Sequence, residues 1–283
     1  MKHGYFACLL VLVLLSVPAP GNTAQEDLVT VSASVNWEKQ LITVRAQLDL
    51  RRAGIKIPSG RDEAELYLKT RFPLECKEAV LNLGFDSYRS ITDTLDDQTI
   101  APAEIEHYMD SWTLVSSALS KDLSTLTMEV TYDLVRLASL YIRHTKALEL
   151  PVIPEFEPTR SYSGIIIYAK GTYGIQGEFE KGFLIPSLFP RIYDETMLLI
   201  MERNRINPEV LRISGQTGWT KDLASPGIAL RAGSDPLRIL AYRIFGTRRS
   251  DIIITRQDAL KILLNESNRA LIRDGKVVIV YGE

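Results

Sequence analysis

The sequence predicts an α+β protein with antiparallel and mixed sheets, helices packed on one face of them, and two lobes. Three observations support this fold class. Apolar and polar residues alternate with period two over 28–50, which indicates a strand hairpin. An apolar stripe at helical spacing over 61–83 predicts a helix that covers one face of that hairpin. Three prolines within 151–158 predict a stiff, extended connector before a strand-rich second half.

The composition is that of a globular protein and excludes several other classes. The 283 residues are 46% apolar and include 33 basic and 35 acidic side chains, for a formal charge of −2. These values exclude a collagen, a coiled-coil rod and a wholly disordered chain. The lack of a basic excess argues against a general nucleic-acid binder, and two cysteines are too few for a disulfide scaffold.

The first residues, 1–24, are typical of a secretory signal peptide. Lys2 precedes an apolar run over 5–17, and small residues then lead to Ala24, the best cleavage position. The run is shorter than the roughly 20 residues that span a bilayer, and an uncleaved anchor is the alternative. Cys8 lies inside the run and not after it, so a lipid anchor is not expected. We therefore expect an exported, periplasmic protein without a transmembrane span after signal cleavage.

The first lobe is expected over 25–150. After the hairpin, the pattern predicts a helix over 61–83, a loop over 85–100 with a short strand at 85–90, a helix over 102–119, a strand over 125–132 and a short helix over 133–148. Ser59, with Asp62 three residues later, resembles a helix-capping arrangement. Pro73 is expected to kink the first helix or to split it in two. Cys76 lies on the apolar stripe of that helix and is expected to be buried and unreactive.

A connector over 151–160 is expected to separate the first lobe from a second one over 161–283, and the alternative is a loop within a single domain. The nearly all-apolar stretch 164–170 is typical of a central strand. Further strands are predicted at 197–201, 228–231, 237–245, 251–255 and 276–281. Thr255, with Asp258 three residues later, is predicted to cap a helix that follows the fourth of these strands.

The motifs that carry chemistry are weak. The glycine-rich stretch 171–177 follows a strand, but Glu178 and Glu180 stand where a bound anion would lie, and the lysine–hydroxyl pair of a P-loop is missing. We expect a flexible connecting loop there. His107 and His144 are far apart in the sequence and have no cysteine pairs beside them, so no metal site and no cofactor are predicted.

Charged side chains leave further options open. The carboxylates that are candidates for a calcium site are Asp93, Asp96 and Asp97, and those for a glycosidase pair are Glu106, Asp194 and Glu195. The first set lacks the EF-hand spacing, so a solvated loop is expected, and a chain with 35 acidic residues makes the second pairing uninformative. Basic residues of the second half are Arg203, Arg205, Arg212, Arg243, Arg248 and Arg249. They are expected on solvated strand edges, with an acidic partner or an anionic polymer as the alternative.

Three segments of the second half occur in a recognisable order. Residues 161–171 read Ser-Tyr-Ser-Gly-Ile-Ile-Ile-Tyr-Ala-Lys-Gly, residues 186–195 read Pro-Ser-Leu-Phe-Pro-Arg-Ile-Tyr-Asp-Glu, and residues 250–259 read Ser-Asp-Ile-Ile-Ile-Thr-Arg-Gln-Asp-Ala. Together they resemble the signature segments of the FlgP-like family of bacterial envelope lipoproteins, over 161–283. The chain as a whole is also similar to uncharacterised exported proteins of spirochaetes.

The resemblance implies a non-enzymatic envelope protein of the kind associated with the flagellar basal body and its oligomeric rings. Two features of this chain depart from the FlgP-like pattern. The Asp-Ala-Arg of that family is Tyr168-Ala169-Lys170 here, and the lipid-bearing cysteine is missing. Membrane tethering is therefore not implied for this chain.

We expect a non-catalytic periplasmic protein that acts by protein–protein association, in the flagellar motor or in envelope assembly. The expected partners are envelope proteins, flagellar basal-body components among them, or further copies of the chain, and not nucleic acid. The positions expected to define the fold are Gly164, Ile165, Ile167, Pro190, Arg191, Asp194, Asp251 and Ile253. Among them, Arg191 is expected to pair with Asp194 or Asp251. The alternative function is a carboxylate-based enzyme or a binding module that acts on an envelope polymer, with carboxylates near 171–182.

Overall fold

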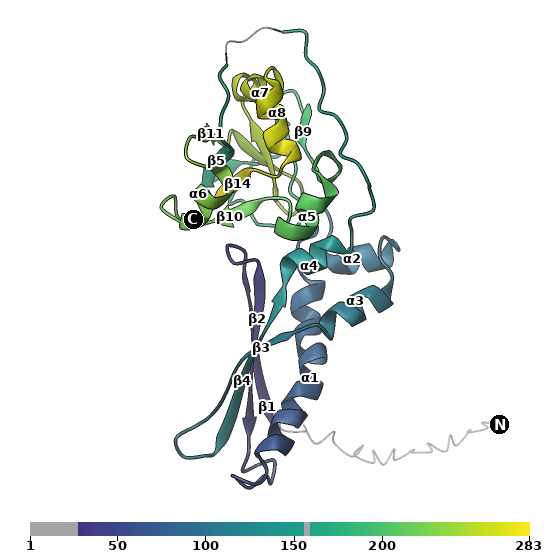
Figure 1. Ribbon diagram of the computed structural model, residues 1–283, viewed down its shortest axis with the longest axis vertical. Coiled ribbons are helices and arrows are strands. Elements are labelled where there is room, and N and C mark those ends of the chain that lie inside the picture. Colours follow the sequence, from purple (N-terminus) through teal and green to yellow (C-terminus); the bar gives the residue numbers. More distant parts are fainter. Residues whose placement is uncertain (1–27, 156–158) are drawn as a thin grey trace, which may run out of the picture.

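A computed structural model of the chain describes residues 28–155 and 159–283. Figure 1 shows a lower lobe, in which a long helix lies along a twisted sheet, and an upper lobe of sheets and shorter helices. The strand order is β1-β2-β4-β3 in the lower sheet, and β10-β14-β5-β11 and β12-β13-β8-β9 in the main sheets of the upper lobe. The predicted α+β class with two lobes is confirmed.

The first lobe is built from a hairpin, a covering helix and a second pair of strands. Its elements are β1 (Val29–Asn36), β2 (Leu41–Asp49), α1 (Arg61–Leu81), α2 (Ile91–Asp96), α3 (Pro102–Met109), β3 (Thr113–Leu119), β4 (Thr125–Asp133) and α4 (Leu134–Ser139). The predicted hairpin is confirmed, since β1 and β2 pair antiparallel. Alternate residues of β2, such as Val44 and Leu48, are fully buried, whereas Arg45 between them is exposed. The buried face therefore packs on α1, as the period-two pattern indicates.

Helix α1 runs unbroken through Pro73, so the helix is not split in two, and the alternative, a kink at Pro73, stays a prediction. Its buried residues Ala64, Leu68, Phe72, Cys76 and Val80 follow a spacing of four and form one stripe against the sheet. Burial of this stripe outweighs the single backbone hydrogen bond that a proline removes. The predicted Ser59 cap is also wrong, because the N-cap is Gly60 and the Ser59 hydroxyl donates to the Lys56 carbonyl instead.

Three predictions for the rest of the first lobe need correction. The segment predicted as one helix over 102–119 is α3 followed by β3, because its second half pairs antiparallel with the edge of β4. The helix predicted over 133–148 ends at Ser139. The segment predicted as a loop over 85–100 contains α2, which begins with a reciprocal capping box between Ser90 and Asp93. In place of the short strand at 85–90 there is an isolated bridge between Gly84 and Ser90.

The second lobe contains short strands and helices in alternation. Its elements are β5 (Ile165–Lys170), β6 (Tyr173–Gly174), β7 (Lys181–Gly182), β8 (Ile192–Asp194), β9 (Leu199–Met201), a 3-10 turn (Arg203–Arg205), α5 (Pro208–Ser214), β10 (Gly218–Thr220), α6 (Pro226–Ala232), β11 (Leu237–Leu240), β12 (Arg243–Phe245), β13 (Asp251–Ile254), α7 (Arg256–Leu263), α8 (Glu266–Arg273) and β14 (Val277–Gly282). The predicted central strand, β5, lies between β14 and β11, and all three run parallel. The predicted strands at β13 and β14 and the Thr255 cap of α7 are also confirmed.

Two strand predictions in this lobe are wrong. The segment 228–231 lies in α6, which begins at Pro226 and is capped by the Ser225 hydroxyl. The segment 237–245 forms two strands, β11 and β12, which belong to different sheets. Helices α5 and α8 were not predicted.

The parallel sheet is covered on both faces. Ile165, Ile167 and Ile279 face the main core of the second lobe, whereas Ile166 and Val278 face α6. Gly164, at the start of β5, lies so close to α6 that a Cβ atom there would stand 2.4 Å from the Ala232 backbone. A glycine at this position therefore permits the close packing of helix on strand.

The lobes meet where the tip of the β1–β2 hairpin reaches the second lobe (Figure 1). The Gln40 amide donates a hydrogen bond of 3.1 Å to the carbonyl of Thr217. The Trp37 ring packs edge-on against the Trp219 ring, with 6.3 Å between the ring centres. Ile142, shortly after α4, is buried in the core of the second lobe. Leu188 of the second lobe is buried in the core of the first lobe. The boundary at 151–160 stays a prediction. None of the helices within residues 28–155 and 159–283 is long and apolar enough to cross a membrane.

Candidate functional site

The residues expected to define the fold lie in two places of the second lobe. Gly164, Ile165 and Ile167 belong to the start of β5. Arg191 and its neighbour Pro190 precede β8, which ends at Asp194, and Asp251 and Ile253 belong to the adjacent strand β13. Of the second group, Asp251 and Arg191 contact the first lobe and form part of the junction between the lobes.

The Asp251 side chain has no exposed surface at this junction. Its carboxylate accepts a hydrogen bond from the Ser87 hydroxyl of the first lobe at 2.7 Å and one from the backbone N–H of Arg191 at 2.8 Å. Burial raises the pKa of Asp251 to about 6, although both hydrogen bonds favour the charged form. Asp251 therefore ties β13 to the loop between α1 and α2.

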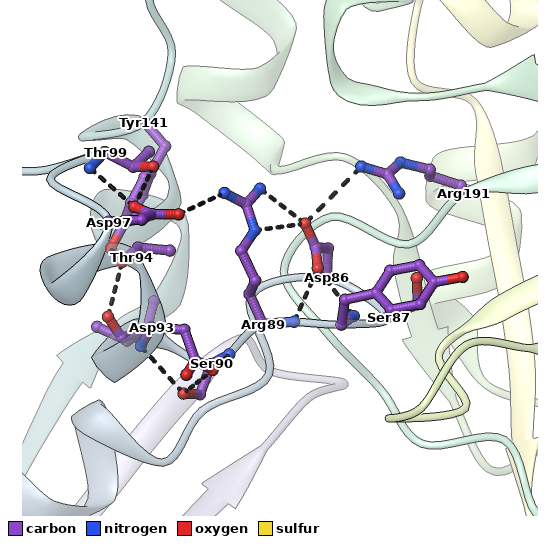
Figure 2. A network of polar contacts seen from close by, with 12 residues as sticks. Asp86, Ser87, Arg89, Ser90, Asp93, Thr94, Asp97, Thr99, Tyr141 and Arg191 are labelled. Carbon is purple, nitrogen blue, oxygen red and sulfur yellow. Dashed lines mark hydrogen bonds and ion pairs between the residues drawn. The ribbon is translucent and has the colours of Figure 1, made fainter.

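That loop carries a polar network of its own, shown in Figure 2. The Asp86 carboxylate accepts two hydrogen bonds from the Arg89 guanidinium, at 2.8 and 3.1 Å, and backbone N–H groups of Tyr88 and Arg89 bind its other oxygen. The Arg89 guanidinium also reaches Asp97 at 3.0 Å. The paired charges and the hydrogen bonds hold the loop in the shape that presents Ser87 to Asp251.

The side-chain partners of Arg191 and Asp194 differ from those predicted. Arg191 contacts Asp251 through its backbone N–H, and its guanidinium lies 3.8 Å from Asp86 of the first lobe. Asp194 forms its ion pair with Arg256, at 2.6 Å, so the predicted Arg191–Asp194 pair is replaced by another. The reason is the position of Arg256 at the start of α7, directly after β13, which pairs with β8.

Replacement of Arg191 by alanine is expected to lower the free energy of unfolding by about 1–2 kcal/mol, because the nearly buried Asp86 and Asp251 lose a neighbouring positive charge while Arg89 still neutralises Asp86. Urea unfolding measures this change. The matched control is Arg45→Ala on the exposed face of β2, for which little change is expected. Equal stability of the Arg191 and Arg45 variants would contradict the proposed ion pair.

The remaining candidates for chemistry lie apart from one another. Cys76 is buried in the first core, and burial raises the pKa of its thiol to about 12, which leaves it a poor nucleophile. His144 lies 2.9 Å from the Ile206 carbonyl, and His107 lies at the end of α3. Among residues 28–155 and 159–283, no three His, Cys, Asp or Glu side chains gather in a way that could hold a metal ion.

The glycine-rich stretch 171–177 forms the first strand and turn of the β6–β7 hairpin. The Glu180 carboxylate, near the tip of this hairpin, lies 3.8 Å from the Arg249 guanidinium, and its side chain is largely exposed. The carboxylates near 171–182 that the enzyme alternative requires are therefore exposed to solvent. Asp251, whose pKa is raised, does not lie beside them in the β6–β7 hairpin but in β13 of the sheet β12-β13-β8-β9.

A different feature lies at one edge of the sheet β10-β14-β5-β11, where β11 is the last strand. Leu237 donates its N–H to Gly164, and Ala241 donates its N–H to Tyr168 of β5. Because backbone groups of a strand point alternately to its two sides, the N–H and C=O groups of Arg238 and Leu240 point away from β5. Within the described part of the chain, no strand pairs with that side of β11. We call these backbone groups the open edge of β11.

A groove of about 300 Å³ lies beside the open edge, on the face of the sheet that carries α6. Its lining residues, which are mostly apolar, are Ile166, Tyr168, Leu223, Arg238, Ile239 and Leu240, and we call it the β11 groove. Leu240 is 67% exposed and Leu223 is 50% exposed, although both are large apolar side chains. Helix α6 covers the sheet over β5 and β14 but leaves this part of it open.

Both halves of the chain match domains of one known protein. Residues 28–140 match the family of the N-terminal domain of Treponema pallidum Tp0624, and residues 164–283 match the family of its second domain. The two matches together cover most of the chain, which is therefore similar to Tp0624 over both of these domains. No curated protein matches it in sequence. The spirochaetal part of the expected resemblance is thus confirmed, and kinship with the FlgP-like family stays a prediction.

The match to the second Tp0624 domain contains the open edge of β11, and the match to the N-terminal domain contains the loop that binds Asp251. Neither feature was predicted from the sequence. Ser87 and Asp86 lie in a polar stretch whose sequence indicates a turn but does not indicate that the turn contacts Asp251. The edge position of β11 depends on strand order, and Pro236 just before it is the one local signal of a strand at an edge.

Proposed function

We propose that this protein works in the bacterial cell envelope as a non-catalytic binding protein, and that it captures an extended segment of a partner protein along β11. The observation that carries the proposal is the open edge of β11 beside the β11 groove. A strand added there would form main-chain hydrogen bonds with Arg238 and Leu240 and place alternate side chains in the groove.

The lining of the β11 groove defines the chemistry of the partner segment. Ile166, Tyr168 and Leu240 offer apolar surface for aliphatic or aromatic side chains. Arg238 is exposed on the same strand and forms no ion pair within the described residues, so it favours an acidic residue beside the apolar ones. The segment that fits is therefore extended, apolar at alternate positions and acidic at one of them.

The cellular setting rests on the sequence. The predicted signal peptide over 1–24, which lies outside the described residues, supports export to the envelope. A place in the flagellar motor is the narrower proposal, and it is supported by the resemblance of 161–283 to the FlgP-like family. Deletion of the gene followed by imaging of motility and flagellar motors tests it, and normal motors with normal swimming would contradict it.

Replacement of Leu240 by aspartate is expected to reduce the partner protein retained from an envelope extract of the source organism by about tenfold or more, because it places a charge in the apolar groove. Leu240→Pro is expected to have a similar effect. It removes an N–H that points away from β5, so the pairing of β11 with β5 is preserved. Retention is measured by quantitative pull-down, together with the solution mass of the complex.

The matched control is Leu230→Asp, since Leu230 is 88% exposed on α6 and does not line the β11 groove. It is expected to retain the partner as the unchanged protein does. Thermal melting of all variants verifies that each is folded. A strictly monomeric protein that retains no partner, or equal retention by the Leu240 and Leu230 variants, would contradict the proposed function.

A further inference from the structure

A second groove, of about 660 Å³, opens at the carboxyl ends of the parallel strands. It is lined by Lys170 at the end of β5, by Gly282 at the end of β14 and by Lys221, which directly follows β10. In open parallel sheets, ligands bind in the crevice outside the carboxyl ends of the strands. The volume of this groove also lies within the range of small-molecule sites. We call it the strand-end groove.

The charged lining of the strand-end groove is mainly positive. The cationic side chains are those of Lys170, Lys221 and Arg249, and the one acidic side chain in the lining is that of Glu283. The Lys170 side chain has no ion pair within the described part of the chain, and that of Arg249 has a distant one, 3.8 Å from the exposed Glu180. Most of this positive charge is therefore available to a ligand.

The same groove has an apolar and aromatic side. The Lys221 ammonium lies 5.6 Å from the centre of the Tyr281 ring, so the tyrosine holds one cation in place. Phe183 and Ile185 line the groove as well, and both remain substantially exposed, at 41% and 50%. Cationic groups beside the exposed Phe183 ring are suited to a ligand that joins an anionic group to an apolar or ring-shaped face.

We propose that the strand-end groove binds a small saccharide that carries a phosphate or carboxylate group. Lys170, Lys221 and Arg249 hold the anionic group, and the exposed Phe183 ring contacts the face of the sugar ring, while Tyr281 keeps Lys221 in position. The site lies apart from the β11 groove, with which it shares no lining residue, so it adds a ligand to the protein rather than a second route to the same partner.

Isothermal titration calorimetry of the full chain tests the proposal with glucose 6-phosphate, glucuronate, inorganic phosphate and glucose as probes. Glucose 6-phosphate or glucuronate is expected to bind more tightly than inorganic phosphate, and glucose is expected not to bind. Lys170→Gln and Lys221→Gln are each expected to weaken binding by about tenfold, the effect of losing roughly 1.4 kcal/mol of charge-assisted contact. The phosphate and carboxylate probes distinguish the two anionic groups.

The matched control is Lys121→Gln, at an exposed turn of the first lobe far in sequence from the groove. It is expected to bind the probes as the unchanged chain does, and Leu240→Asp is expected to do so too. No heat of binding for either sugar anion, equal binding of glucose, or equal weakening by Lys121→Gln would overturn the proposal. Binding that persists in Leu240→Asp while partner retention is lost would show that the two sites are separate.

Discussion

Replacement of Asp194 by alanine is expected to lower the free energy of unfolding by about 2–4 kcal/mol, because the backbone N–H groups that bind its buried carboxylate lose their acceptor, while Arg256 keeps an ion pair with Glu155. Asp194 has no exposed surface. One of its carboxylate oxygens accepts hydrogen bonds from the backbone N–H groups of Thr196 and Leu198, both at 2.9 Å, and the other accepts from Arg256 at 2.6 Å. Burial alone would raise the pKa of Asp194, but the hydrogen bonds from Thr196 and Arg256 outweigh it and lower the pKa.

Urea unfolding at neutral pH measures this effect, with two comparisons. Asp194→Asn is expected to cost less than Asp194→Ala, because an amide oxygen still accepts the two backbone hydrogen bonds of the turn. Asp235→Ala removes an exposed ion pair with Arg160, and it is expected to change stability far less. An Asp194→Ala protein as stable as the Asp235→Ala protein would contradict the structural role of Asp194.

Asp251 is expected to make the protein less stable as the pH rises from 4 to 7. Its pKa in the folded protein is about 6, above the value of about 3.9 for an unperturbed aspartate. Between these two values the folded state binds the proton more tightly than the unfolded state does. The stabilisation from this group is therefore fully present below about pH 4 and is lost as the pH rises through 6.

Comparison of the unchanged protein with Asp251→Asn isolates this contribution from the other titrating groups. The asparagine side chain can still bind Ser87 and the Arg191 N–H but does not titrate. Between pH 4 and pH 7, the difference in unfolding free energy is expected to shift by about 2 kcal/mol in favour of the asparagine variant. Urea unfolding at a series of pH values measures it, and a difference that does not depend on pH would contradict the raised pKa.

Local patterns predicted those elements whose structure is decided locally. The alternation over 28–50, the apolar run at β5 and the Thr255 cap each depend on neighbouring residues, and each is confirmed. The wrong predictions concern segments whose structure depends on distant partners. The stretch 113–119 is a strand because β4 offers an edge to it. The stretch 228–231 is helical because Ser225 and Pro226 begin a helix that packs on β5 and β14.

The candidate site was predictable in part for the same reason. Arg191 and Asp251 were recognised as positions important for the fold, and they do meet through the Arg191 backbone. The Ser87 partner of Asp251 is 164 residues away in the sequence, and no pattern around Ser87 indicates this contact. The open edge of β11 is a property of strand order, which alternation of residues does not encode.

Amide hydrogen exchange at Arg238 and Leu240 tests the central claim most directly. In the isolated protein these two N–H groups point away from β5, so they are expected to exchange faster than that of Leu237, which is bonded to Gly164. With the retained partner bound, residue-resolved NMR is expected to show that exchange at both positions slows by about tenfold or more. Formation of the complex with unchanged exchange at Arg238 and Leu240 would contradict strand capture along β11.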